Sequence, residues 1–164
     1  MSEVKTYYNN EGPKGAQVVC ELKLPPYHAT PEAVAKYEKY GKRILWIDSN
    51  VVPGSFQMNS SWYFHPNKPE GEVVVDKNLP ATQSHVHEDA DEIVAFYGSD
   101  PQHQEELNGE IEFWIDGERY VFTKSVMVFL PAGMPHGPLF ILKVDKPIFH
   151  YSVVTSREYS FEGK

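Results

Sequence analysis

Residues 84–92 read SHVHEDADE, and residues 131–136 read PAGMPH. Together these two stretches contain three histidines and one carboxylate that can converge on a single metal ion: His85, His87, His136 and Glu92. The first two histidines are two residues apart, so on a β-strand both imidazoles would face the same way. Neutral imidazole and carboxylate groups suit Zn, Fe, Mn, Co, Ni or Cu. The pattern predicts a metal site, and an octahedral ion held by four protein ligands would leave two positions for water, substrate or dioxygen.

The environment of Glu92 strengthens this hypothesis. Glu92 begins an apolar stretch in which Val94 and Phe96 share its face by strand alternation. A carboxylate among apolar side chains is costly unless it is paired or bound to a cation. The alternative is a strand-end Glu92 that simply reaches water. His136 follows a turn whose prolines and glycine restrict the backbone, which would orient its ring before a metal ion binds.

Composition restricts the class of protein. A chain of 164 residues predicts one domain that can bury a core without disulfides. The net charge of −8 argues against non-specific binding to nucleic acid, and no basic run suggests a membrane patch. Cys20 is the only cysteine, so nothing predicts an oxidising compartment, and we expect it to be a small buried residue. The N-terminal residues do not resemble a signal peptide, and a cytoplasmic protein is expected.

The chain contains one clear helix signal and many short strand signals. Thr30 and Pro31 predict the start of a helix near residues 30–41, with Gly41 as the residue that ends it. Asp116-Gly117 predicts a two-residue hairpin between two alternating strands. The strands are expected near residues 16–24, 43–47, 59–64, 72–75, 91–98, 110–115, 118–123, 126–130, 139–144 and 147–154, and residues 99–109 are expected to form a loop. Many short strands with turns between them predict an all-β sandwich or barrel.

The two histidine stretches resemble the paired motifs of the cupin superfamily. The first motif resembles His-x-His, then Glu, then a glycine, which is Gly98 here and falls one residue early. The second resembles Pro-x-Gly-x-x-His, and Phe140 stands where an asparagine is often found. The resemblance implies a small antiparallel jelly-roll β-barrel, a homodimer, and metal ligation by the residues that match the motifs: His85, His87, Glu92 and His136. It implies a single domain over residues 1–164, with an N-terminal arm, strand and helix in 1–54 and the barrel core in 55–155.

Other side chains are candidates for roles beside the metal. His150 either points into the barrel as a base or packs as a core histidine. Tyr63 and Tyr97 are candidates to donate to a metal-bound oxyanion, because a buried phenol needs a hydrogen-bond partner. Two aspartates and two further histidines are expected to have no role in the site. Asp89 and Asp91 are expected to be solvent-facing turn residues, although either could replace Glu92 as a ligand, and His65 and His103 are expected at the surface.

The leading hypothesis is a metal-dependent enzyme that acts on a small organic substrate, such as an enol, phenol or carboxylate. A dioxygenase-type oxidoreductase with iron is favoured slightly, because histidine and carboxylate ligands with open positions suit oxygen chemistry. The first alternative is a non-redox lyase or isomerase with Zn, Mn or Ni and with His150 or Tyr97 as base. The others are a non-catalytic protein that binds a small ligand or metal, and a closed metal site with a structural role.

Overall fold

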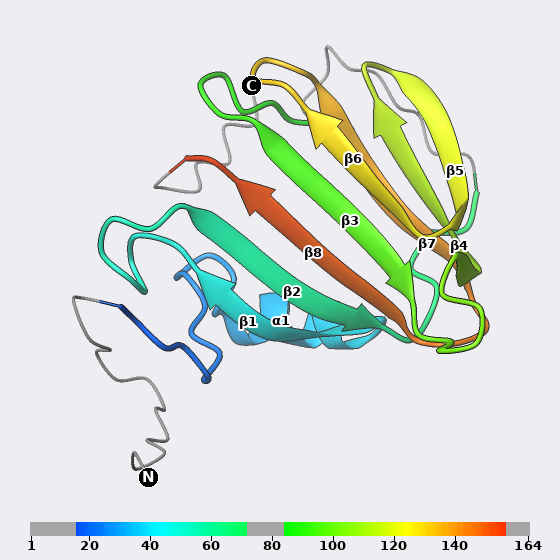
Figure 1. The fold of residues 1–164 in the computed structure, drawn as a ribbon, viewed down its shortest axis with the longest axis horizontal. Helices are drawn as coiled ribbons and strands as arrows, with labels where there is room; N and C mark the ends of the chain where they lie inside the picture. The colour runs from blue at the N-terminus through cyan, green and yellow to red at the C-terminus, as the bar shows by residue number, and fades with distance from the viewer. Residues whose placement is uncertain (1–15, 72–83, 157–164) are drawn as a thin grey trace, which may run out of the picture.

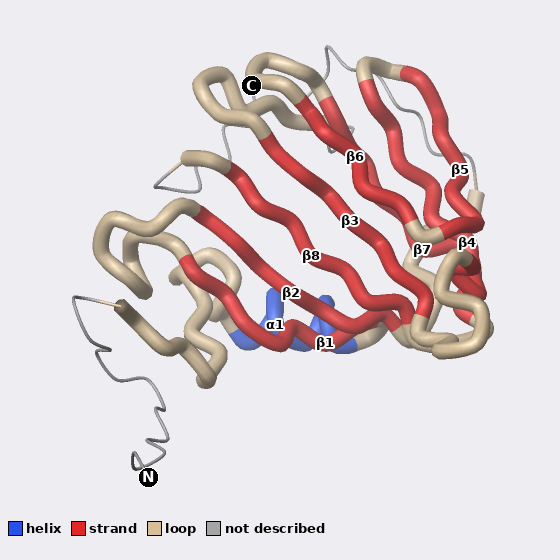
Figure 2. Tube along the Cα trace, viewed as in Figure 1, coloured by secondary structure: helices blue, strands red, loops and turns tan. Residues whose placement is uncertain are grey.

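Two antiparallel sheets form the fold of this chain. The computed structural model describes residues 16–71 and 84–156. One sheet has five strands in the order β1-β2-β8-β3-β6, and the other has three strands in the order β5-β4-β7 (Figure 1). The elements are α1 Pro31–Glu38, β1 Gly41–Ile47, β2 Gln57–Tyr63, β3 Glu92–Gly98, β4 Glu106–Ile115, β5 Glu118–Lys124, β6 Val126–Leu130, β7 His136–Val144 and β8 Ile148–Val154. This arrangement confirms the predicted antiparallel jelly roll with a single short helix (Figure 2).

The helix begins as predicted and ends earlier. Thr30 is the N-cap, and its hydroxyl oxygen accepts a hydrogen bond from the Ala33 amide at 3.2 Å. The last helical residue is Glu38, and Gly41 is the first residue of β1 rather than the residue that ends the helix. A Cβ at Gly41 would lie 2.7 Å from the Trp62 carbonyl oxygen, so close packing against β2 explains this glycine.

The predicted hairpin forms where expected. Asp116 and Gly117 have φ angles of 48° and 80°, the left-handed conformation that a two-residue turn of this kind requires. The turn joins β4 and β5, whose register pairs Ile115 with Glu118. The first strand of the hairpin, however, begins at Glu106, inside the segment predicted to be a loop.

The core lies between the two sheets. Phe96 of β3, Leu107 and Ile111 of β4, Ile141 of β7 and Ile148 of β8 are fully buried there. The aromatic rings of Tyr37 and Tyr40, from α1 and the turn after it, pack against this cluster, so the helix joins the core. β1 also belongs to the five-stranded sheet, although it lies in the predicted N-terminal region, 1–54.

Two predictions for residues 16–24 are wrong. No strand forms in this segment, which contains only an isolated bridge residue. Because no sheet covers the segment, Cys20 is exposed rather than buried. The strand expected at 72–75 lies outside the described residues. In the described part of the chain, no helix is long and apolar enough to cross a membrane.

A buried carboxylate on the outer side of β4 anchors distant segments. Glu112 is 1% exposed, and its oxygens accept hydrogen bonds from Lys68 Nζ at 2.8 and 3.1 Å, Arg119 Nη2 at 2.7 Å and Trp114 Nε1 at 2.9 Å. Burial alone would raise the pKa of Glu112, but the hydrogen bonds from Arg119, Lys68 and Trp114 lower it to about 2.

We therefore expect Glu112 to contribute to acid sensitivity. A folded pKa below the usual 4.5 means that its stabilisation is present above about pH 4.5 and is lost as the pH falls toward 2. Glu112→Gln should lower stability at pH 7 and flatten the decline in unfolding free energy between about pH 5 and 2. Urea unfolding at several pH values measures this, with the exposed Glu118→Gln as control. If the unfolding free energy fell equally steeply with pH in the wild type and in Glu112→Gln, the prediction would be wrong.

Candidate metal centre

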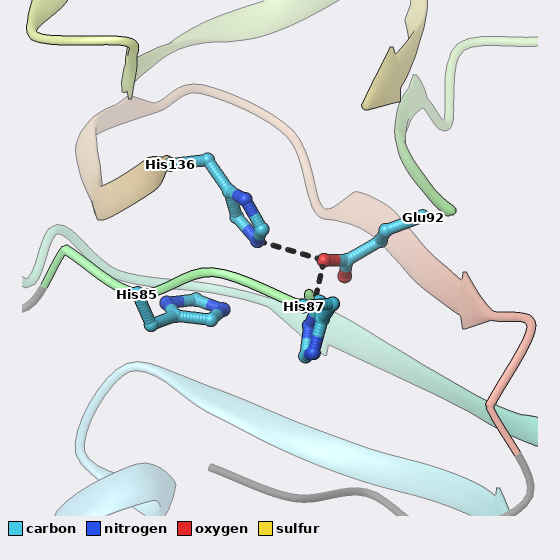
Figure 3. A group of neighbouring side chains, drawn as sticks. All are labelled: His85, His87, Glu92 and His136. Carbon is cyan, nitrogen blue, oxygen red and sulfur yellow. Dashed lines mark ion pairs between the residues drawn. The ribbon is translucent and has the colours of Figure 1, made fainter. Parts of the chain in front are cut away.

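The four predicted ligands meet in one place. One ligand atom from each of His85, His87, Glu92 and His136 lies within 4.8 Å of the others. The Glu92 Oε2 atom is 2.8 Å from His136 Nε2 and 3.2 Å from His87 Nε2. Figure 3 shows the Glu92 carboxylate reaching toward these two rings, with His85 on the same segment as His87. Among the described residues, this is the group of histidine, cysteine and acidic side chains that could hold a metal ion.

Backbone hydrogen bonds between the two motif segments position the histidines. The His85 amide donates to the His136 carbonyl, and the His136 amide donates to the His85 carbonyl, both at 2.9 Å. The Gly133 amide donates to the His87 carbonyl at 2.8 Å. The two-residue spacing of His85 and His87 was interpreted as that of a β-strand. In the structure, both residues lie outside the sheet strands. They lie on an extended segment that the Pro131–His136 turn holds in place.

The acidic neighbours of Glu92 do not belong to the cluster. The Asp91 Oδ1 atom accepts a hydrogen bond from the Ala132 amide at 2.9 Å, which ties the two motif segments together. Asp89 is exposed, as expected for a turn residue. Glu92 itself is only 7% exposed and begins β3, with Val94 and Phe96 buried on the same strand. The carboxylate is thus not simply a strand-end group in water.

The tautomer of His136 makes a cation favourable at this point. His136 Nδ1 lies 2.8 Å from the Met134 carbonyl oxygen. A carbonyl can only accept, so Nδ1 carries the proton, and in the neutral ring Nε2 has a lone pair. That lone pair faces a carboxylate oxygen at 2.8 Å. Two acceptors in contact repel each other unless a proton or a metal ion lies between them, and neither atom makes a well-aligned hydrogen bond to the described residues.

The donor set fits a divalent transition metal. Ligand atoms about 2.1 Å from an ion are about 3 Å apart when adjacent and about 4.2 Å apart when opposite. The contacts of 2.8 and 3.2 Å and the overall spread of 4.8 Å need only small adjustments to meet these values. Burial raises the pKa of Glu92, but hydrogen bonds and positive charge from His136 and His87 more than offset this and lower it to about 2. Positive charge between the rings and the carboxylate, whether from a proton or from a metal ion, thus keeps Glu92 ionised, as a ligand must be. The chemistry of these donors suits iron, manganese, zinc, nickel, cobalt or copper.

A cavity of about 470 Å³ adjoins the cluster. Its lining includes His85, Glu92 and His136, so three of the four candidate ligands face a space that a small molecule can enter. The remaining walls combine the apolar Val94 and Phe113 with several polar side chains. A closed structural metal site would not need such a space beside it.

His150 lies in the wall of this cavity, at the centre of β8. Its ring stacks between Tyr63 and Phe96, with centroid distances of 5.2 and 5.0 Å. Burial lowers the pKa of His150 to about 4, so the ring is neutral at pH 7. Nδ1 donates to the Ala95 carbonyl at 3.1 Å, which leaves Nε2 as a hydrogen-bond acceptor. His150 thus packs in the core and also lines the cavity, and its role as a base stays a prediction.

The two tyrosines do not reach the cluster. Tyr97 is on β3, but alternation places it on the face opposite Glu92 and Val94, where its ring stacks on Tyr151. Tyr63 is buried among Tyr37, Tyr40 and His150 and does not line the cavity. Neither position supports a direct role for their hydroxyl groups. His65 and His103 are exposed, as expected for surface histidines.

The cavity wall includes three residues that the sequence motifs do not indicate: His28, Lys36 and Ser152. Ser152 had a usable signal, because it lies two residues from His150 and therefore on the same face of β8. His28 and Lys36 come from the segment around α1, and nothing in their local sequence indicates which part of the barrel this segment contacts. Burial, together with Arg43, lowers the pKa of His28 to about 4.

Comparison with solved structures gives distant similarities in fold. Recombinant oxalate oxidase in complex with glycolate matches with 15% identity and a TM-score of 0.45, over 93% of this chain and 74% of that one. A cupin superfamily sugar phosphate isomerase from Silicibacter pomeroyi matches with 18% identity and a TM-score of 0.45, over 74% of this chain and 62% of that one. The Schizosaccharomyces pombe Cnp3 cupin domain matches with 12% identity and a TM-score of 0.40 over 63% of this chain, which spans about half (54%) of that one.

No protein-family model and no curated protein sequence matches the chain. The fold is apparent in the chain's own architecture. Two antiparallel sheets surround a core, and both motif segments meet at the edge of that core to bring three histidines and a glutamate together. The chain therefore has a two-sheet antiparallel jelly-roll fold, with a cluster of three histidines and one glutamate between its two motif segments.

Proposed function

We propose that the chain is a metal-dependent enzyme that acts on a small organic substrate. The observation that carries this proposal is the cavity of about 470 Å³ against which three of the four candidate ligands lie. His85, His87, Glu92 and His136 would hold the ion. When bound, the ion would supply a Lewis acid for an enolate, phenolate or carboxylate oxygen. We propose iron as the metal and a dioxygenase-type oxidoreductase as the class, because this donor set suits oxygen chemistry.

The side chains around the cavity would bind and orient the substrate. The acceptor Nε2 of His150 would take a hydrogen bond from a substrate hydroxyl, and the stacked Tyr63 and Phe96 rings hold the imidazole in place. The Ser152 hydroxyl accepts from Asn59 Nδ2 at 2.8 Å, so its own proton is available to a substrate oxygen. Val94 and Phe113 would exclude water from the apolar part of the substrate.

A non-redox lyase or isomerase is the second candidate. The observation that favours it is the presence of a neutral histidine and a lysine, His150 and Lys36, in the wall of one cavity. Such groups can move a proton within a substrate without any change in oxidation state. The homodimer implied by the resemblance stays a prediction, and light scattering of the purified chain would check it.

Oxygen consumption separates these functions. The purified chain is reconstituted with Fe(II) and screened with phenolic and enolic substrates, with and without air. Oxygen uptake that depends on substrate is the expected result, and the His150→Asn variant should turn over more slowly while it retains metal. Oxygen-independent turnover would favour the lyase or isomerase. Metal binding with neither turnover nor substrate binding would overturn the enzyme proposal.

A further inference from the structure

A second cavity, of about 620 Å³, lies beside the first and is rich in lysine. One wall comes from α1 and the turn after it, with Lys36, Lys39 and Tyr40. The rest of the lining comes from the segment that contains Lys68 and from Leu139 and Phe140 of β7. Three lysines therefore line one space in a chain whose net charge is −8.

Most of this positive charge is not neutralised. Lys68 shares the Glu112 carboxylate with Arg119, so a single negative charge faces two cations there. Among the described residues, neither Lys36 nor Lys39 forms an ion pair. A basic residue in the last turn of a helix is favourable in itself. That effect accounts for a lysine at the end of α1, but not for the convergence of three lysines from two distant segments.

The two cavities adjoin each other, because Lys36 and Leu139 line both of them. Leu139 follows His136 by three residues on β7, so the lysine cavity begins a short distance along the same strand from a candidate metal ligand. A molecule in the metal cavity that extended past Lys36 would approach Lys39 and Lys68.

We propose that this lysine cavity is an anion subsite for the substrate of the metal centre. It would bind a carboxylate or phosphate group through Lys36 and Lys39, while the other end of the same organic acid reaches the cavity beside His136. Lysine recognises both anions as a point charge with three donors. The second half of this proposal rests on the proposed function, whereas anion binding by the lysines does not.

Binding to metal-free protein tests the subsite alone. Titration calorimetry of the full chain after chelator treatment measures binding of inorganic phosphate and, separately, of malonate. The double variant Lys36→Gln/Lys39→Gln should weaken binding about tenfold, as expected for the loss of two ion pairs. The control is Lys42→Gln, which removes the same charge from an exposed residue of β1 that lines neither cavity. It should change affinity less than twofold.

The two probes distinguish the acid, since tighter phosphate binding indicates a phosphate ester and tighter malonate binding indicates a carboxylic acid. Binding should also weaken as salt is added. No binding of either probe at concentrations on the order of 10 mM would overturn the subsite. So would equal losses in the lysine double variant and in Lys42→Gln.

Proximity to the metal centre is tested separately with Mn²⁺. Paramagnetic Mn²⁺ should accelerate the ³¹P relaxation of phosphate in the wild type and do so much less in Lys36→Gln/Lys39→Gln. If Mn²⁺ binds but lysine-dependent relaxation is absent, the link between the two cavities is wrong and the proposed function stands. If Mn²⁺ does not bind while the lysine-dependent affinity persists, the metal-centre proposal fails and the anion subsite stands.

Discussion

Replacement of His136 by alanine is expected to weaken binding of a divalent metal ion by about 100-fold or more. Loss of an outer hydrogen-bond partner of a metal ligand already costs about 10- to 100-fold in affinity, and His136 would be a direct ligand. The main chain of residue 136 pairs with His85 through two backbone hydrogen bonds. Removal of the ring leaves these main-chain atoms in place, so the pairing can persist in the variant. The expected defect is therefore in metal uptake and not in folding.

Thermal stability measures the same loss in a second way. A ligand at about 1,000 times its dissociation constant stabilises a protein by about 4 kcal/mol, and one at 10 times by about 1.4 kcal/mol. A metal concentration that stabilises the wild type by about 4 kcal/mol should therefore stabilise His136→Ala by only about 1.4 kcal/mol. Elemental analysis after dialysis gives the bound metal directly, and circular dichroism of the metal-free proteins checks the fold.

The exposed histidines supply the matched controls. His65→Ala and His103→Ala remove the same ring from positions outside the cluster, and both should bind metal as the wild type does. Retention of full metal content by His136→Ala would show that the ligand assignment is wrong. Equal loss in all three variants would show that the metal binds histidine non-specifically.

Local patterns predicted the parts of the fold that depend on neighbouring residues. The Asp116-Gly117 turn needs left-handed backbone at both positions, and the residue types alone indicate it. Thr30 and Pro31 indicate the helix start in the same way. The end of the helix was less predictable, because Gly41 is required by the approach of the Trp62 carbonyl from β2, a contact between separate elements.

The metal cluster was predictable as a set of residues but not as a local structure. The His-x-His spacing predicted a strand, whereas the pairing of His85 with His136 is an isolated bridge. Both arrangements bring the rings to one side, so the ligand set does not depend on which one forms. The lysine cavity had no local signal, since Lys36 and Lys68 come to line one space only when the chain is folded.

Glu112 illustrates a further limit. Strand alternation places it opposite Ile111 and Phe113 and thus on the outer face of β4, where solvent exposure would be expected. It is 1% exposed because Lys68 and Arg119 cover it. Arg119 lies just across the hairpin, but Lys68 is 44 residues away, and such long-range covering cannot be inferred from periodicity.

Substitution of Gly98 by alanine is expected to destabilise the chain by about 3 kcal/mol or more, at the upper end of the cost of overpacking. A Cβ at this position would lie 2.0 Å from the Glu106 carbonyl oxygen and 3.2 Å from the Leu107 carbonyl carbon. Both atoms belong to the backbone, so no side-chain rotation can relieve the clash. β4 would have to move away from the end of β3, and it would take with it Leu107, a fully buried core residue.

This steric requirement gives a physical reason for a glycine at the end of the first motif, even though Gly98 falls one residue early. For a chain of this size, 3 kcal/mol corresponds to a decrease of about 10 °C in Tm. Gly54→Ala is the matched control, since its φ of +85° imposes strain of about 1 kcal/mol but nothing lies within 4 Å of the added carbon. Because Glu92 is at the opposite end of β3, the folded Gly98→Ala protein should still bind metal. Equal Tm decreases for the two variants would mean that β4 moves away at little cost and that its approach does not account for Gly98.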